Sequence, residues 1–164
     1  MRLLMWMALA MPAGMMWGQE GGREQILAVY QATLAAIRTV NSEAGLLRMV
    51  DAMDAPEWVG VLPGGRTLTR VEAIGQLKGL LGVPAERRPG MGIEMIHVAE
   101  SGDTAEVVCW VFVELPGGEL RGTIARDKWA RVEAGWRRVR HEKIFPERPL
   151  VRTGKGFGLM GEVP

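Results

Sequence analysis

Hydrophobic positions in the first half of the chain recur at the spacing of α-helices. Residues 23–39 carry four of them on one helical face: Ile26, Tyr30, Leu34 and Ile37. A second, shorter helix is predicted from a cap at Asn41 or Ser42. We expect it to end near Asp54, because Pro56 disfavours helical geometry in the residue before it.

A capping box marks the start of a third helix. In the segment Thr-Arg-Val-Glu, the hydroxyl of Thr69 can accept a hydrogen bond from the backbone N–H of Glu72, whose carboxylate can accept one from Thr69. The predicted helix has an apolar face made of Val71, Ile74, Leu77 and Leu81. Residues 57–65, between the second and third helices, predict a short strand that ends in a turn.

From Met91 onward, apolar and polar positions alternate, which is typical of β-strands. Four alternating segments are separated by glycine-containing, hairpin-type connections: residues 92–100, 104–115, 119–132 and 136–145. Helices followed by an antiparallel meander indicate an α+β fold rather than alternating βαβ units. Residues 146–164 are rich in glycine and proline and lack periodicity, so we expect a loosely ordered tail.

Residues 1–18 have the plan of a secretory signal peptide: a basic start at Arg2, an apolar centre, and small residues after Pro12. Cleavage is expected after Gly18, and a retained N-terminal anchor is the alternative. The apolar run is shorter than the ~20 residues that a membrane-spanning helix needs. We therefore expect an exported protein, periplasmic or secreted, with one domain over residues 19–145 and no stable membrane insertion after cleavage.

The charge and the cysteine content narrow the possible functions. Without Arg2 the chain has equal numbers of basic and acidic residues, and this neutrality argues against a nucleic-acid partner. The single cysteine, Cys109, excludes an intramolecular disulfide and is expected to be a buried small hydrophobe. The two histidines, His97 and His141, are far apart and lack neighbours at ligand spacing. We expect neither a metal site nor a cofactor.

Three segments together resemble a known superfamily. Residues 54–65 read D-x-P-x-W-V-x-V-x-P-x-G, residues 68–73 read L-T-R-x-E-A, and Arg126 to Trp136 holds two tryptophans separated by six residues. This order resembles the SnoaL-like and ketosteroid-isomerase-like domains of the nuclear-transport-factor-2-like superfamily. The resemblance implies a cone, in which a strongly curved antiparallel sheet wraps around two or three helices and leaves a pocket open at one end.

The same resemblance implies several activities, since such domains include isomerases, cyclases, dehydratases and modules without known catalysis. Many relatives place pocket histidines four and six residues after the second tryptophan. Here those positions hold Arg140 and Glu142, and the histidine is His141, on the opposite parity. Transfer of any pocket chemistry therefore depends on where His141 points.

The last predicted hairpin carries the candidate acid/base pair. A three-residue loop at residues 133–135 places Asp127 opposite His141. A carboxylate beside an imidazole fixes the tautomer of the ring, which suits a general base. The neighbouring register would place Asp127 opposite Arg140 instead. In either register the alternative is an ordinary charge pair on a solvated sheet face, which contributes ~0.2–1 kcal/mol.

Several aromatic residues are candidates for a pocket or an interface. Tyr30, Trp58 and Trp129 are predicted to line the pocket, with simple core packing as the alternative for the first two. On the strand 104–115, one face is wholly apolar and suits the core: Ala105, Val107, Cys109, Val111 and Val113. The other face presents Trp110 and Phe112, at the pocket or at an interface between subunits. A homodimer through this face is favoured, because relatives commonly pair through the outer side of this sheet.

Two functions from different classes remain open. The first is an exported domain that binds a small apolar ligand and has no established catalysis. The second is an isomerase-, cyclase- or dehydratase-type enzyme that uses Asp127 and His141 as an acid/base pair on a small apolar substrate. A structural dimer is a third possibility, and fold alone does not choose among the three.

Overall fold

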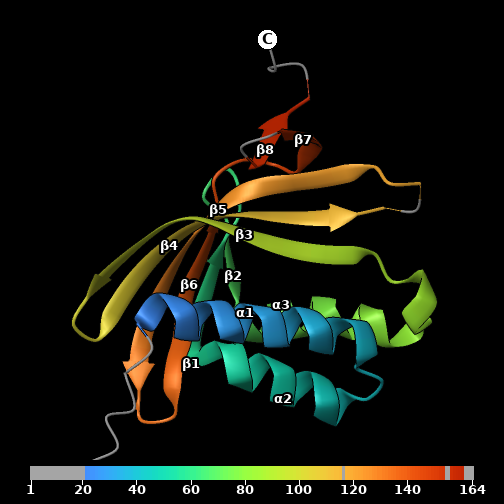
Figure 1. Ribbon diagram of the computed structural model, residues 1–164. Coiled ribbons are helices and arrows are strands. Elements are labelled where there is room, and N and C mark those ends of the chain that lie inside the picture. The colour runs from blue at the N-terminus through green and yellow to red at the C-terminus, as the bar shows by residue number, and fades with distance from the viewer. Residues whose placement is uncertain (1–20, 116, 154–155, 161–164) are drawn as a thin grey trace, which may run out of the picture.

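The computed structural model describes residues 21–115, 117–153 and 156–160. The signal-peptide prediction for residues 1–18 lies outside these ranges. A layer of helices packs under a curved sheet (Figure 1). The elements are α1 (Gly22–Thr39), α2 (Glu43–Met53), α3 (Arg70–Lys78), β1 (Asp54–Val61), β2 (Thr67–Thr69), β3 (Gly90–Ser101), β4 (Thr104–Glu114), β5 (Leu120–Val132), β6 (Gly135–Lys143), β7 (Arg148–Thr153) and β8 (Gly156–Leu159). No helix among the described residues is long and apolar enough to cross a membrane.

The strand order along the sheet is β2-β1-β6-β5-β4-β3, with β7 paired to β5 and β8 paired to β7. The predicted meander is confirmed for β3 to β6, which pair antiparallel in sequence. One parallel pair, β1 with β6, makes the sheet mixed rather than purely antiparallel. This pairing brings Asp54, at the start of β1, beside Arg138 of β6. The fold is therefore α+β, as the order of helices and strands predicts.

The helix caps agree with the sequence more closely than the helix faces do. Ser42 caps α2, and the capping box of Thr69 and Glu72 opens α3. Ile74 and Leu77 pack against the core, but Val71, predicted on the same face, is 79% exposed. None of the residues of α3 is fully buried, so this helix is less deeply packed than α1 and α2.

The inner face of the sheet packs against α1 and the end of α2. On β4 the predicted inner positions Ala105, Val107 and Cys109 are buried, whereas Val111 and Val113 are only partly buried. The burial of this face therefore falls from one end of β4 to the other. The less buried end borders a cavity, whose walls include both valines.

Hydrogen bonds from Arg88 link the connection between α3 and β3 to the end of α1. Its buried guanidinium donates hydrogen bonds to the carbonyls of Ile37 and Val40 at 3.0 and 2.7 Å, and its Nε donates to Val83. These carbonyls lie at a helix C-terminus, where no intrahelical donor is available to them. Arg88 thereby holds residues 83–88 against the helix layer.

The segment expected to be a loosely ordered tail forms two strands in its described part. β7 pairs with the start of β5 through Leu150 opposite Leu120. This pairing needs a glycine at 122, because a Cβ there would lie 2.5 Å from the Val111 carbonyl oxygen and 2.8 Å from the Leu150 side chain. The sequence lacks a periodic signal here because Leu150 is the one fully buried residue of β7.

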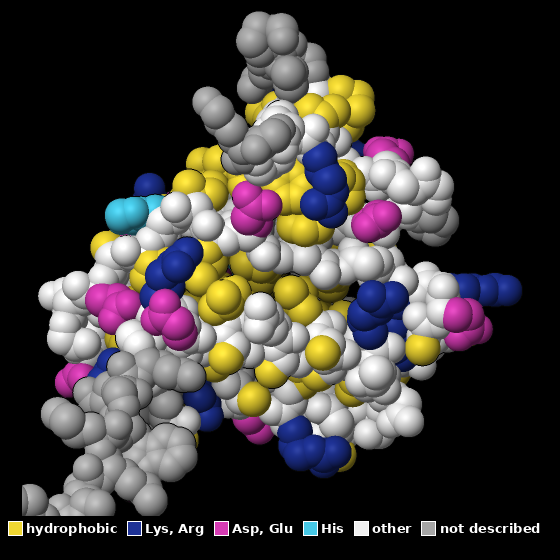
Figure 2. All heavy atoms as spheres, viewed as in Figure 1, with side chains coloured by type: hydrophobic (Ala, Val, Ile, Leu, Met, Phe, Trp, Pro, Cys, Tyr) yellow, Lys and Arg dark blue, Asp and Glu magenta, His cyan; other side chains and the backbone are white. Residues whose placement is uncertain are grey.

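The outer aromatic pair of β4 lies against this C-terminal hairpin. The ring centroid of Phe157 is 6.2 Å from that of Trp110 and 4.6 Å from that of Phe112. The guanidinium of Arg152 lies 5.1 Å from the Phe157 ring. Figure 2 shows hydrophobic side chains at the surface beside the C-terminal strands, with a basic side chain among them. A dimer through Trp110 and Phe112 stays a prediction, and it would have to include Phe157.

Candidate functional site

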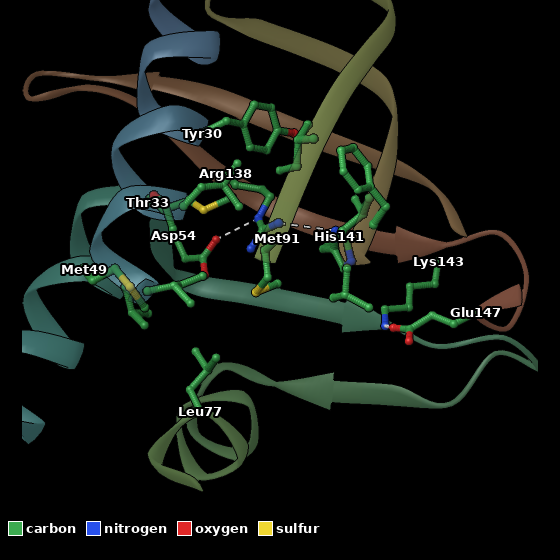
Figure 3. Close-up of a pocket in the computed structure, with 18 of the residues that line it drawn as sticks. Tyr30, Thr33, Met49, Asp54, Leu77, Met91, Arg138, His141, Lys143 and Glu147 are labelled. Carbon is green, nitrogen blue, oxygen red and sulfur yellow. Dashed lines mark hydrogen bonds and ion pairs between the residues drawn. The ribbon is translucent and has the colours of Figure 1, made fainter. Parts of the chain in front are cut away.

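A cavity of about 230 Å³ lies between the helix layer and the inner face of the sheet. Its walls are mostly apolar and include Met49, Met53, Leu77, Met91 and Ile93. A row of charged side chains runs along one side: Asp54, Arg138, His141, Lys143 and Glu147 (Figure 3). An apolar cavity with a few convergent polar groups is the usual form of a small-molecule site.

The last hairpin brings Asp127 and His141 together by a different route from the predicted one. Val132 pairs with Gly135, so the loop holds two residues rather than three. The register then shifts between Lys128 and Trp129, where β6 has one extra residue. The extra residue of this β-bulge compensates for the loop being one residue shorter than predicted, so Asp127 does lie opposite His141.

The bulge has a second consequence, which sequence reasoning missed. Strict alternation would turn side chains three positions apart to opposite faces of a strand. Because β6 bulges between them, Arg138 and His141 both face the cavity. The guanidinium of Arg138 contacts three partners. It lies 2.8 Å from the carboxylate of Asp54, 3.4 Å from that of Asp127 and 3.3 Å from Nδ1 of His141.

Asp127 is completely buried, and its carboxylate is the centre of the network. The Tyr30 hydroxyl donates to Oδ2 at 2.5 Å, and Nδ1 of His141 lies 2.6 Å from Oδ1. Burial alone would raise the pKa of Asp127. The positive charges of His141 and Arg138, together with the hydrogen bonds, outweigh burial and lower the pKa to about 2. Asp127 is therefore ionised at neutral pH and only accepts hydrogen bonds.

The ionised carboxylate fixes the tautomer of His141. Since Asp127 has no proton to donate, Nδ1 of His141 carries the proton of their shared hydrogen bond. In the neutral ring, Nε2 then holds the free lone pair. The side chain is 14% exposed and lines the cavity, so this nitrogen is the group available to a ligand.

Burial and the neighbouring Asp127 raise the pKa of Tyr30 well above its ordinary value. Tyr30 therefore stays a phenol and serves as a fixed donor to the carboxylate. Burial likewise raises the pKa of the Cys109 thiol to about 12. Cys109 is completely buried and remains protonated, in agreement with its prediction as a small hydrophobe.

Two carboxylates, those of Asp54 and Asp127, stabilise the positive charge of Arg138. Burial would lower the pKa of the guanidinium, but Asp127 and Asp54 outweigh it and raise that pKa above its ordinary value. The Arg138 guanidinium also lies 5.6 Å from the Trp58 ring. One cation thus stabilises two carboxylates whose side chains are 12% and 0% exposed.

The structure divides the predicted pocket aromatics into two groups. Tyr30 lines the cavity, as expected. Trp58 and Trp129 do not line it; they are 5% and 1% exposed and lie in the core behind the charged row. Trp129 donates from Nε1 to the Tyr30 hydroxyl at 3.3 Å and packs edge-on against its ring. Both tryptophans therefore support the polar network from behind.

Asp54 and Arg138 are site residues that the sequence did not single out. In the sequence, Asp54 is only the expected end of the second helix and the first residue of the segment 54–65. Its pairing with Arg138 spans 84 positions and depends on the parallel contact of β1 with β6. No local pattern predicts such a contact. Among the described residues there is no cluster of His, Cys, Asp or Glu that could hold a metal ion.

Comparisons with known proteins place the fold. No family model matches the sequence, and no curated protein matches it either. An NTF2-like protein with a cystatin-like fold from Novosphingobium aromaticivorans is similar in structure, with a TM-score of 0.58 and 17% identity over 87% of this chain and 84% of that one. An NTF2-like protein of unknown function from Shewanella oneidensis gives 0.60 at 10% identity, over 73% of this chain and 96% of that one. A conserved protein from Planctomyces limnophilus gives 0.58 at 14%, over 77% and 96%.

The protein therefore has the nuclear-transport-factor-2-like, cystatin-like α+β fold, as the sequence resemblance implied. At these identities the similarity shows the fold alone. The SnoaL-like subclass stays a prediction from the sequence.

Proposed function

We propose that the protein binds a small, largely apolar molecule in the cavity under its sheet. The observation that carries this proposal is the cavity itself, with apolar walls and the charged row of Asp54, Arg138 and His141 along one side. An engineered apolar cavity of ~150 Å³ is large enough to hold benzene. At about 230 Å³, this one has room for a somewhat larger molecule. The buried network behind it keeps the polar groups in place before a ligand arrives.

Native mass spectrometry of the gently purified protein tests this proposal. We expect an added mass on the wild-type chain, either from a retained molecule or after incubation with 1-octanol. Leu77→Trp fills the cavity from α3 and should remove the adduct. Val71→Trp adds the same side chain to an exposed position of the same helix and should keep it. Bare protein under both conditions contradicts the proposal, as does an adduct that survives in Leu77→Trp.

Acid/base catalysis is a second candidate, favoured by the braced tautomer of His141. The 2.6 Å contact with Asp127 holds the ring so that Nε2 is free to take a proton from a bound molecule. If the protein is an enzyme, the wild type should convert the retained molecule, whereas His141→Gln should bind it without converting it. Recovery of the molecule unchanged from both proteins excludes this candidate.

Export is proposed together with this function, on the strength of residues 1–18. The N-terminal sequence of protein recovered outside the cytoplasm tests it. The chain should begin at Gln19, and a chain that still begins at Met1 contradicts cleavage.

A further inference from the structure

We infer that the ligand carries an anionic group, with a carboxylate as the best fit, and that Arg121 binds it at the open end of the cavity. This inference rests on the proposed function and names the chemical class of the ligand. It is carried by the position of Arg121, by its lack of an ion-pair partner among the described residues, and by the charge difference between the two ends of the cavity.

Exposure shows which end of the cavity is open. Along the charged row, side-chain exposure rises from 12% at Asp54 and 14% at His141 to 28% at Lys143 and 47% at Glu147. The closed end is therefore at Asp54 and Arg138, with Asp127 buried behind them, and the open end lies toward Lys143 and Glu147.

Arg121 lies at the same open end, on the inner face of β5. Side chains alternate along a strand, so Arg121 shares a face with the buried Thr123 and Asp127. Its pairing partner in β4 is Val113, which also lines the cavity. Arg121 lies six positions before Asp127, which corresponds to ~20 Å along the strand. The long side chain of Arg121 spans part of this distance, and the apolar walls span the rest.

Arg121 differs from the other cations of the cavity in its ion pairing. Arg138 is engaged by Asp54 and Asp127, and Lys143 donates to Glu147 at 2.8 Å. Arg121 is partly buried and lines the cavity. Within the described residues 21–115, 117–153 and 156–160, it forms no ion pair. A partly desolvated guanidinium presents planar paired donors that match a carboxylate.

The charges also fix the direction of binding. At the closed end, the carboxylates of Asp54 and Asp127 offset the charge of Arg138, so that end carries no excess positive charge in either protonation state of His141. At the open end, Arg121 and Lys143 face one carboxylate, that of Glu147, which leaves an excess positive charge. An amphipathic carboxylate is therefore attracted to the open end rather than to the closed end. Its apolar body then lies between Met53, Leu77 and Ile93.

Calorimetric titrations with octanoate, 1-octanol and octylammonium test this inference. The wild type should bind octanoate about tenfold or more tightly than 1-octanol, and octylammonium most weakly, since a hydrogen bond to a charged group contributes ~1.5–3 kcal/mol. Arg121→Met removes the charge but keeps an apolar stem. It should weaken octanoate binding about tenfold and leave 1-octanol binding unchanged.

A matched control lies on the same strand. Arg126→Met removes an arginine whose side chain is 45% exposed on the opposite face of β5, and it should change neither affinity. If Arg121→Met does not fold, Arg121→Lys should keep part of the preference for octanoate. A preference for octanoate that survives Arg121→Met overturns the inference, and so does equal binding of octanoate and 1-octanol by the wild type. If no probe binds, the proposed function fails with it.

Discussion

Replacing Asp127 with asparagine is expected to lower the free energy of unfolding by about 3–5 kcal/mol. The carboxylate is completely buried and accepts from Tyr30 and His141 while it neutralises Arg138. Asparagine keeps the shape, but it brings an NH₂ group into a site that contains only donors and leaves Arg138 less compensated. Urea denaturation at neutral pH measures the difference.

A second carboxylate variant provides the control. Glu106 faces Arg126 at 3.7 Å, with both side chains 45% exposed, so Glu106→Gln should change the stability by less than about 1 kcal/mol. An Asp127→Asn effect as small as this would mean that the network is not held together by charge.

The same carboxylate should make stability depend on pH in acid. The pKa of Asp127 falls from an ordinary 3.8 to about 2 in the folded protein, so the unfolded chain takes up its proton first. The stabilisation from this difference is present above about pH 4 and is lost as the pH falls through about 2. Its size is roughly 2–3 kcal/mol, at 1.36 kcal/mol per pKa unit. In Asp127→Asn, this part of the decrease in the free energy of unfolding at low pH should be absent.

Arg138→Met is expected to be as harmful as Asp127→Asn, at about 3–5 kcal/mol, because it leaves Asp54 and Asp127 without their shared cation. Loss of the guanidinium also raises the pKa of Asp127, since Arg138 is one of the charges that lower it. The difference in the free energy of unfolding between the wild type and Arg138→Met should therefore shrink as the pH falls and the carboxylates protonate.

Two further variants separate charge from packing in this experiment. Adding Asp54→Asn to Arg138→Met should recover part of the lost stability, because it removes one of the two uncompensated carboxylates. Arg140→Met, in the same strand, removes an arginine that is 44% exposed and should cost less than about 1 kcal/mol. A deficit in Arg138→Met that is constant with pH would indicate lost packing instead of lost charge.

Local patterns were sufficient for the elements that are built from local signals. The apolar stripe containing Ile26 and Tyr30 predicts α1, and the capping box at Thr69 predicts the start of α3. The alternation after Met91 predicts the meander of β3 to β6. In each case the residues that determine the structure lie within one helical turn or one hairpin of one another.

The site was only partly predictable, for physical reasons that differ from residue to residue. Asp127 and His141 belong to one hairpin, so counting from the turn could bring them together. Arg138 required a β-bulge, and Asp54 required a parallel contact with a distant strand, neither of which has a local signature. Trp58 is of a residue type that often lines pockets, but it is 5% exposed and lies in the core beside the Arg138 guanidinium.

The most direct test of the central claim, a small-molecule cavity under the sheet, is an NMR titration of methionine methyl groups with 1-octanol. Met49, Met53 and Met91 line the cavity, whereas Met160 is 61% exposed at the C-terminal strands and serves as an internal control. We predict saturable shifts of the three cavity methyl resonances and none for Met160. Resonances that do not move, or that all move together with Met160, would contradict a binding site in this cavity.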